Sequence, residues 1–178
     1  ANMIAHTVNA HEGWGFEEGD RSLVAMPLFH VGGLAHLVGP LLQGGHAVLM
    51  AAPVPDEVLR SIERHRVTHG FFVPTVIQSL LATPGLADMD LSSLRRVMYG
   101  AAPISETLLS RAMTALRCDF LHAYGLTEAG GTVTALSPRD HDPGGPRASL
   151  LRSCGRPVPW AEVGLFHPET GEPVATGQ

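Results

Sequence analysis

The sequence predicts an α/β protein with a doubly wound, mainly parallel sheet flanked by helices, followed by a short C-terminal β segment. Short apolar runs alternate with helix-length segments whose apolar residues recur every three or four positions. Glycine, proline or polar residues separate these segments. Strands joined through helices form right-handed crossovers and parallel sheets, which bind ligands at the carboxyl ends of their strands. Small, kinked or polar residues follow each apolar run, so this edge of the sheet is expected to hold a site.

The first strand is expected at residues 22–26 and the first helix at residues 31–43. That helix is apolar on most of its faces, which predicts that it is buried. The glycines at 44–45 end it, because glycine adopts the positive φ of a helix C-terminus. The later elements are a strand at 46–50, a helix beginning at Asp56 and Glu57, a strand at 69–73, a helix around 76–81, a strand at 94–100, a helix capped by Ser105 and a strand at 119–124.

The pattern changes in the C-terminal part. Residues 137–147 form a polar connector rich in proline and glycine, and residues 163–178 resemble a strand, a turn and the start of a second strand. We therefore expect an α/β subdomain at 1–136, and at 137–178 a connector with the start of a β subdomain. A lone hairpin is barely stable in water, so this β subdomain is expected to be truncated.

The composition indicates part of a larger protein. Hydrophobic residues make up 44% of the chain and charged residues only 16%, below the roughly 25% of an average soluble domain. No apolar run approaches the roughly 18 residues of a membrane span, and the chain starts without a basic leader, so a cytoplasmic protein is expected. We expect missing segments to cover apolar surface, and the isolated chain to self-associate. An ordinary apolar small domain is the alternative.

Charge and ligand spacing exclude several functions. The net charge is −5 and the twelve basic residues, all arginine, are scattered, which argues against nucleic-acid binding. Cys118 and Cys154 lie too far apart for a metal or redox motif and are expected to be buried, reduced thiols. The ten histidines lack the spacing of zinc ligands.

The segment "YGLTE" (124–128) combines residue types that suit a nucleotide and its metal. Tyr124 offers a flat ring for stacking on a base, and Gly125 allows close approach of the backbone. Thr127 can donate a hydrogen bond to a phosphate, and Glu128 offers a hard oxygen ligand for Mg²⁺. The alternative is that these residues are structural: a buried tyrosine, a glycine in a turn and a glutamate on the surface.

The segment "YGAAP" (99–103) adds a second strand end with little side-chain bulk. Gly100, Ala101 and Ala102 leave room for a flat ring against the backbone, and Pro103 precedes the next helix. An ordinary strand–helix turn is the alternative.

Four segments together resemble the acyl-CoA synthetases of the adenylate-forming superfamily: "MPLFHVGGL", "VMYGAAPIS", "FLHAYGLTEAGG" and "SCGRPVPWAEVGLFHPETGEPV". Their order and spacing match, and the resemblance covers essentially the whole chain. It implies an enzyme that joins ATP and a carboxylic acid to give an acyl-adenylate and pyrophosphate, and then passes the acyl group to coenzyme A.

The resemblance also implies roles for individual residues. Tyr124 would stack on adenine, Thr127 would contact the phosphate and Glu128 would hold Mg²⁺. His122 stands where the family often has Asn or Gln beside the adenine amino group, so its hydrogen bond is open. The other nucleotide-binding positions are Gly100, Ala101, Ala102, Pro103, Ala123 and Gly125.

For the acid, the resemblance assigns Phe29 and His30 to the aromatic/His motif beside the acyl pocket. A lone histidine is more often a structural residue, which is the alternative for His30. Val73, Pro74 and Thr75 would line the same pocket and are equally good core residues.

The family's lysine-bearing phosphate loop, ribose-binding aspartate and C-terminal lid have no counterpart in this sequence. We therefore expect a fragment of the large N-terminal domain of an ATP-dependent ligase for a fatty or aryl acid, inactive by itself, whose partners include the missing parts of the enzyme. The alternatives are an amino-acid adenylation domain of a peptide synthetase and a non-catalytic nucleotide-binding module.

Overall fold

The computed structural model describes residues 13–175 and contains a single seven-stranded sheet. The strands are β1 (Arg21–Val24), β2 (His46–Leu49), β3 (His69–Phe72), β4 (Arg96–Gly100), β5 (Asp119–Leu126), β6 (Gly131–Leu136) and β7 (Arg156–Pro157). The α-helices are α2 (Val31–Leu42), α3 (Pro55–His65), α4 (Pro74–Leu81) and α5 (Glu106–Leu116). Four short 3₁₀ turns join them: η1 (Leu86–Asp88), η2 (Thr127–Ala129), η3 (Pro138–Asp140) and η4 (Ala148–Arg152).

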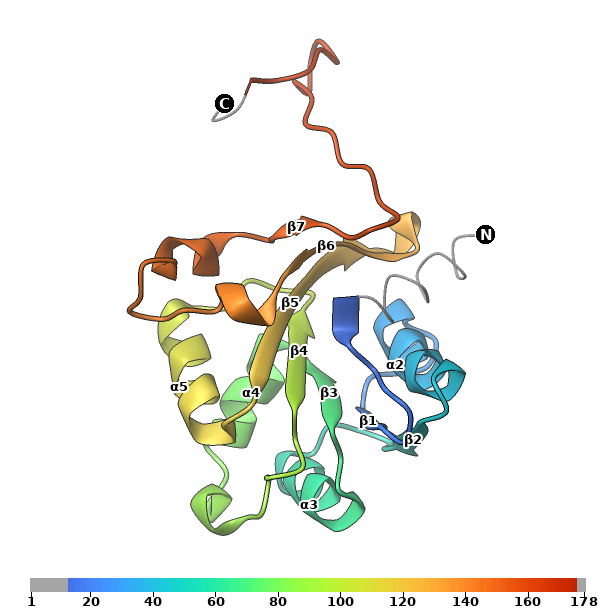
Figure 1. Ribbon diagram of the computed structural model, residues 1–178, viewed down its shortest axis with the longest axis vertical. Coiled ribbons are helices and arrows are strands. Elements are labelled where there is room, and N and C mark those ends of the chain that lie inside the picture. Colours follow the sequence, from blue (N-terminus) through green and yellow to red (C-terminus); the bar gives the residue numbers. More distant parts are fainter. Residues whose placement is uncertain (1–12, 176–178) are drawn as a thin grey trace.

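The sheet confirms the predicted fold class. Its strand order is β2-β1-β3-β4-β5-β6-β7; the first five strands are parallel, and β6 and β7 run antiparallel to their neighbours. Helix α2 lies against one face, whereas α3, α4 and α5 pack side by side on the other (Figure 1). The chain winds outward from β1 to β2 and then back across the sheet to β3, β4 and β5. This reversal makes the sheet doubly wound.

Side chains alternate between the two faces of the strands, so the sheet has a core on each side. The larger core lies under α3, α4 and α5 and contains Phe72, Tyr99 and Phe120. Their chain neighbours Phe71, Met98 and Leu121 point the other way, into a smaller core with Trp14 and Phe16.

Two expectations about the helices are corrected by the structure. Helix α2 was expected to be buried on most faces, but Leu41 and Leu42 are 52% and 60% exposed. The side of α2 that packs is formed instead by small residues and a histidine: Gly33, Ala35, His36, Gly39 and Pro40. Helix α3 begins at Pro55 and has no side-chain cap. Asp56, expected to act there, pairs with Arg60 one turn later at 2.8 Å.

The sequence analysis did not predict β6, nor the continuation of β5 to Leu126. Beyond β6, the chain returns along the sheet: Leu151 joins the larger core and β7 pairs with β6. The expected C-terminal hairpin has one bridge, between Phe166 and Pro173, and extends away from the body (Figure 1). The end of that hairpin, residues 176–178, lies outside the described residues. The division into 1–136 and 137–178 stays a prediction.

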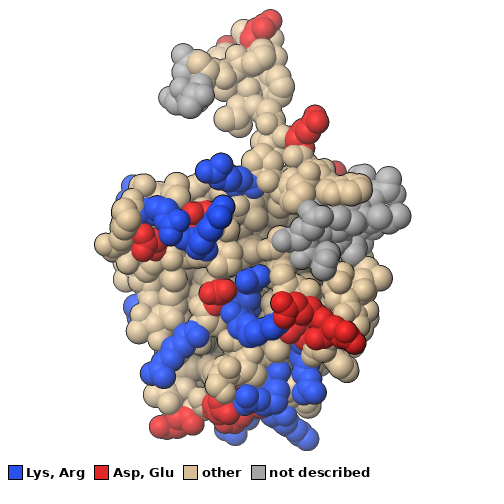
Figure 2. Space-filling model, in the orientation of Figure 1, with Lys and Arg blue, Asp and Glu red and all other residues tan. Residues whose placement is uncertain are grey.

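Acidic and basic side chains are mixed on the face of the molecule drawn in Figure 2, where blue arginines lie among red carboxylates. Ion pairs among the described residues include Arg66 with Asp90 at 2.7 Å and Arg152 with Glu106 at 2.7 Å. None of the described helices is long and apolar enough to cross a lipid bilayer.

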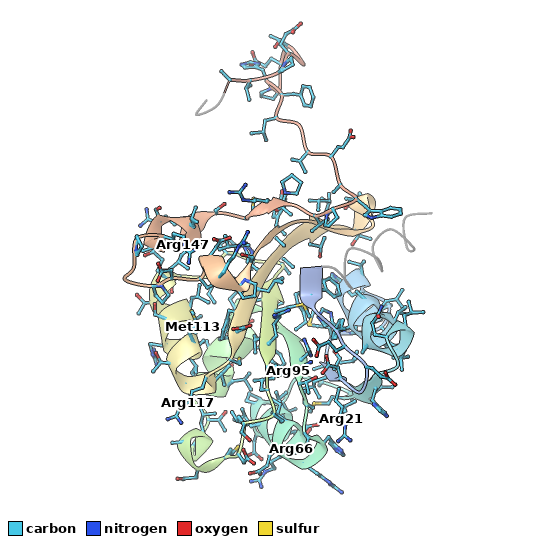
Figure 3. The ribbon with its side chains drawn as sticks, viewed as in Figure 1. Arg21, Arg66, Arg95, Met113, Arg117 and Arg147 are labelled. Atoms are coloured by element: carbon cyan, nitrogen blue, oxygen red, sulfur yellow. The ribbon has the colours of Figure 1, made fainter. Side chains whose placement is uncertain are left out.

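A polar cluster around the buried side chains of Asp20 and His69 lies at the edge of the sheet where the parallel strands begin. Arg95, just before β4 (Figure 3), bonds to Asp20 and pairs with Glu17 at 3.0 Å. His69 lies 3.6 Å from Asp20 and is 1% exposed. Burial, only partly opposed by Asp20, lowers the pKa of His69 to about 4. The imidazole is therefore neutral at pH 7, and Arg95 is the cation that balances Asp20.

Candidate functional site

The carboxyl ends of β4 and β5 form the floor of a cleft of about 750 Å³, called here the larger cleft. Its lining residues are Tyr99, Ala101–Glu106, His122–Gly125 and Leu151–Cys154. This volume falls in the range of roughly 300–1,000 Å³ that is typical of small-molecule sites. The expected convergence of the segments after β4 and β5 is thus present.

Tyr124 and His122 point to the same side of β5, because alternate residues of a strand share a face. Both line the larger cleft. The Tyr124 side chain is 51% exposed, so one face of its ring is available to a planar ligand. On the opposite wall, Ala101, Ala102 and Pro103 present little bulk.

His122 is held in place by its neighbours. Its ring stacks on Tyr99 with centroids 4.8 Å apart and an interplanar angle of 9°. Its Nδ1 lies 3.4 Å from the carbonyl oxygen of Ser153 and must donate, since a carbonyl only accepts. Desolvation lowers the pKa of His122, partly offset by that bond, so the ring is neutral at pH 7 with its other nitrogen an acceptor.

Tyr99, under His122, is fixed in turn by His141. His141 Nδ1 donates to the carbonyl of Ser137 at 2.9 Å, which leaves Nε2 to accept from the Tyr99 hydroxyl at 3.0 Å. Burial raises the pKa of Tyr99, so its hydroxyl keeps the proton. The connector after β6 therefore supports the cleft from below.

Gly100 and Gly125 are required for a reason different from the one expected. A Cβ on Gly100 would collide with the carbonyl oxygen of Ala123 on β5, and Gly100 itself does not line the cleft. A Cβ on Gly125 would collide with the carbonyl oxygen of Gly131 on β6, at the irregularity between Tyr124 and Gly125 in the β5–β6 pairing. Both glycines thus allow strands to approach each other at the site. Ala101 adopts φ 64°, a left-handed conformation that costs roughly 1–2 kcal/mol in a residue with a Cβ.

Thr127 and Glu128 follow β5 directly, in the 3₁₀ turn η2. Both are exposed, and neither lines the larger cleft. Among the described residues no cluster of three or more potential metal ligands occurs. A single accessible carboxylate is nevertheless compatible with Mg²⁺, which usually takes one or two carboxylates together with substrate phosphates.

A second cavity of about 70 Å³, called here the smaller pocket, lies on the other face of the same strand ends. It is lined by Trp14, His30–Gly32, Ala35, His36, Phe71, Ala101, Ala123, Gly125, Leu126, Gly131 and Thr132. Ala101, Ala123 and Gly125 line both cavities. Two ligands could therefore lie back to back with only small residues between them.

Of the residues expected to line a pocket for the acid, only His30 lines one of the two cavities. His30 lines the smaller pocket and also caps α2, since its Nδ1 accepts from the backbone N–H of Gly32 at 3.1 Å. Phe29 is 95% exposed and lines neither cavity. Val73, Pro74 and Thr75 lie at the N-terminus of α4 and also line neither cavity.

Several cavity residues were missed by the sequence analysis. Glu106 and Arg152 form their ion pair beside the larger cleft, where the chain returns from β6. Trp14 and His36 line the smaller pocket, although no spacing in the sequence singled them out.

Cys154 was expected to be buried and is instead exposed in the larger cleft. Cys118 is half-buried, and burial raises its pKa to about 12, so that thiol stays protonated.

Comparison with known proteins gives a consistent result over the whole chain. A family model described as "AMP-binding enzyme" matches residues 1–178. Among curated proteins, the chain is 38% identical over 178 residues to a feruloyl-CoA synthase from Amycolatopsis, and 37% identical over 165 residues to the medium/long-chain-fatty-acid–CoA ligase FadD8 of Mycobacterium tuberculosis. These matches cover 99% and 93% of the chain but 35% and 28% of the relatives.

Solved structures share the fold. The amide bond synthetase McbA from Marinactinospora thermotolerans superposes with a TM-score of 0.86 at 35% identity, covering 99% of this chain and 35% of that protein. The O-succinylbenzoate coenzyme A synthetase of Bacillus subtilis, solved with ATP and magnesium, gives a TM-score of 0.85 at 28% identity with the same coverage. The chain thus spans about a third of the length of these proteins.

Proposed function

Since the chain belongs to the AMP-binding enzyme family, we propose that it is the part of an AMP-forming acid–CoA ligase that holds adenine and the acyl group. The observation that carries the proposal is the arrangement of two cavities on opposite faces of the sheet that share Ala101, Ala123 and Gly125 in their walls. One cavity has the size and the exposed flat ring that suit a purine. The other is small and apolar, as an acyl group requires.

In the larger cleft, adenine would lie between the Tyr124 ring and the backbone of Ala101 and Ala102. Stacking of this kind stabilises a base by roughly 1–3 kcal/mol. The acceptor nitrogen of neutral His122 suits the amino group of adenine better than the keto oxygen of guanine. The Ser153 carbonyl and the Tyr99 ring keep that nitrogen in one orientation.

The triphosphate would extend from the cleft along η2, where Thr127 can donate to a phosphate oxygen. Glu128 would hold Mg²⁺, which when bound supplies positive charge to the phosphates. In the reaction, a carboxylate oxygen of the acid bonds to the α-phosphorus and pyrophosphate leaves. The thiol sulfur of coenzyme A then bonds to the acyl carbon, and AMP leaves.

The acceptor differs among the similar proteins, whose names include CoA ligases, a fatty acid–[acyl-carrier-protein] ligase and an amide bond synthetase. We propose coenzyme A, because most of the curated relatives are named as CoA ligases or synthases. An assay of the second step with coenzyme A, a carrier protein and an amine separates the three acceptors.

The first step is tested by acid-dependent exchange of labelled pyrophosphate into ATP, catalysed by the full-length protein that carries this segment. Glu128→Ala is expected to lower the exchange rate at least a hundredfold, because a metal ligand would be lost. Glu57→Ala removes another exposed carboxylate, on α3, and serves as the matched control. Near-normal exchange by Glu128→Ala would refute the metal assignment. No exchange by the wild-type protein with any acid would refute the ligase itself.

A further inference from the structure

The smaller pocket is closed at one end by a column of three flat rings. His36 lies between Trp14 and Phe71, with ring centroids 4.9 Å and 5.0 Å away and interplanar angles of 18° and 29°. All three line the pocket, and their exposed fractions are only 3%, 8% and 3% for Trp14, Phe71 and His36. The column therefore belongs to the pocket wall and to the protein core at once.

This wall is rigid. The Nδ1 of His36 donates to the carbonyl of Gly32 in the preceding turn of α2, at 2.9 Å. Phe16 packs edge-on against His36, with centroids 6.4 Å apart and an angle of 77°. Because the imidazole is fixed by rings on three sides and by the helix backbone, it cannot swing aside without disrupting the smaller core.

Gly32 provides room in front of this wall. A Cβ at Gly32 would lie 3.2 Å from Cε1 of Phe71, closer than an ordinary contact, and 3.4 Å from Nδ1 of His30, at the edge of ordinary contact. Gly32 is near the start of α2, where a glycine is not needed for backbone conformation. Its missing side chain therefore leaves space that the pocket uses.

On this basis we propose that the enzyme activates a compact acid, with an acyl group no larger than about one ring, and that the Trp14–His36–Phe71 column sets this limit. The inference rests on the proposed function. The pocket measures about 70 Å³, whereas even a benzene-sized ligand occupies an engineered cavity of roughly 150 Å³. A ring can fit only with one edge toward the opening, and a long alkyl chain meets the column.

The test uses the full-length protein and measures acid-dependent pyrophosphate release with acetate, benzoate and dodecanoate. The wild-type kcat/KM is expected to be at least about tenfold higher for benzoate than for dodecanoate, a difference typical of a steric limit in an apolar pocket. His36→Ala opens the column and should move the benzoate-to-dodecanoate ratio about tenfold toward dodecanoate, with an unchanged KM for ATP. His36→Phe keeps a ring in the column and should keep the preference for benzoate.

Gly32→Ala should make the smaller pocket smaller, whereas His36→Ala makes it larger. The added methyl group should lower kcat/KM for benzoate relative to acetate, with an unchanged KM for ATP. Leu41→Ala, on the exposed side of the same helix, is the control for effects on helix stability.

A wild-type preference for dodecanoate would overturn the inference and leave the ligase assignment standing. Equal losses for benzoate and dodecanoate in His36→Ala, with a normal Leu41→Ala protein, would also overturn it, because the column would then be purely structural. If no acid supports pyrophosphate release, the proposed function fails and this inference fails with it.

Discussion

Among single residues, Tyr124 is the one on which binding of a purine in the larger cleft depends most directly. About half of its side chain is exposed, although it belongs to a strand whose preceding residues are in the core. If the ring stacks on adenine, Tyr124→Ala should raise the KM for ATP roughly tenfold or more and change the KM for the acid little, since stacking is worth about 1–3 kcal/mol.

Tyr124→Phe is the matched control, because it keeps the ring and removes only the hydroxyl. It should behave nearly as wild type in steady-state kinetics. Equal increases in both Michaelis constants for Tyr124→Ala would contradict a specific stacking role.

The sequence predicted which single residues lie at the site where neighbouring residues in the chain were enough to indicate their place. Tyr124 and Ala101 were assigned to one cavity from their positions at strand ends, and His122 through the family resemblance; the structure brings all three together. At Gly125 the structure adds a reason for glycine that the sequence analysis lacked, because the carbonyl that excludes a side chain there comes from β6, a strand it did not predict. Trp14 and His36 gave no signal, since their stacking arises only when α2 packs on the sheet.

At the scale of elements, the pairing of β5 with β6 positions the residues of the site. Gly125 is the position in this pairing where an added side chain would fit least. An alanine there would bring its Cβ into the carbonyl of Gly131, so the two strands would have to separate. We expect Gly125→Ala to lower the free energy of unfolding by about 1–3 kcal/mol, the usual cost of overpacking, and to lower activity as well.

Gly13→Ala is the control, because the added Cβ would meet no atom within 4 Å apart from its chain neighbours and the local helix backbone. Urea denaturation of both variants measures the difference. Equal stability of Gly125→Ala and the wild type would show that the strands can shift at no cost.

Strands were predicted best where short, mainly apolar runs are bounded by turn residues. Strands β1 to β4 lie within two residues of their expected ranges, because parallel strands in a covered sheet read as continuous apolar segments. Strand β6 was missed because "GTVTAL" is partly polar and begins with glycine, and it becomes a strand by pairing with β5. Leu41 and Leu42 made α2 look buried, but the sheet takes up its glycine-rich side instead.

At the scale of the whole molecule, the buried His69 makes stability depend on pH. An unfolded histidine titrates near its ordinary pKa of about 6.5, whereas His69 in the folded protein resists protonation down to about 4. Between these values the unfolded state binds a proton that the folded state excludes, so the free energy of unfolding falls as the pH is lowered. Above pH 6.5 this effect is absent, and below pH 4 it is complete, at up to roughly 3 kcal/mol.

Denaturation at several pH values between 4 and 7.5 tests this expectation. His69→Asn, which does not titrate, should have a flatter stability profile than the wild type. His46→Ala, a change at an exposed histidine on β2, should leave the slope unaltered. If the stability of the wild type and of His69→Asn changed with pH in the same way, His69 would not be the source of the pH dependence.

The doubly wound sheet followed from the alternation of strands and helices, but the path of the chain after β6 did not. Residues 138–157 contain few apolar residues, and their return over β5 depends on contacts such as Leu151 in the core and Tyr99 with His141. Figure 3 shows Arg147 on this returning segment, far from the cluster around Arg95. Four of the fifteen residues that line the larger cleft, Leu151–Cys154, therefore come from a returning segment whose path the sequence did not predict.

The partition shared by the two cavities consists of the backbone at Ala101, Ala123 and Gly125, with no side chain larger than a methyl group. A single molecule with a purine at one end, a short polar link and a benzoyl-sized group at the other would occupy both compartments at once. Because its second end binds without a further loss of translational freedom, it should be held far more tightly than the two halves added separately. Enlarging any residue of the partition would push the two ends apart and remove most of that advantage.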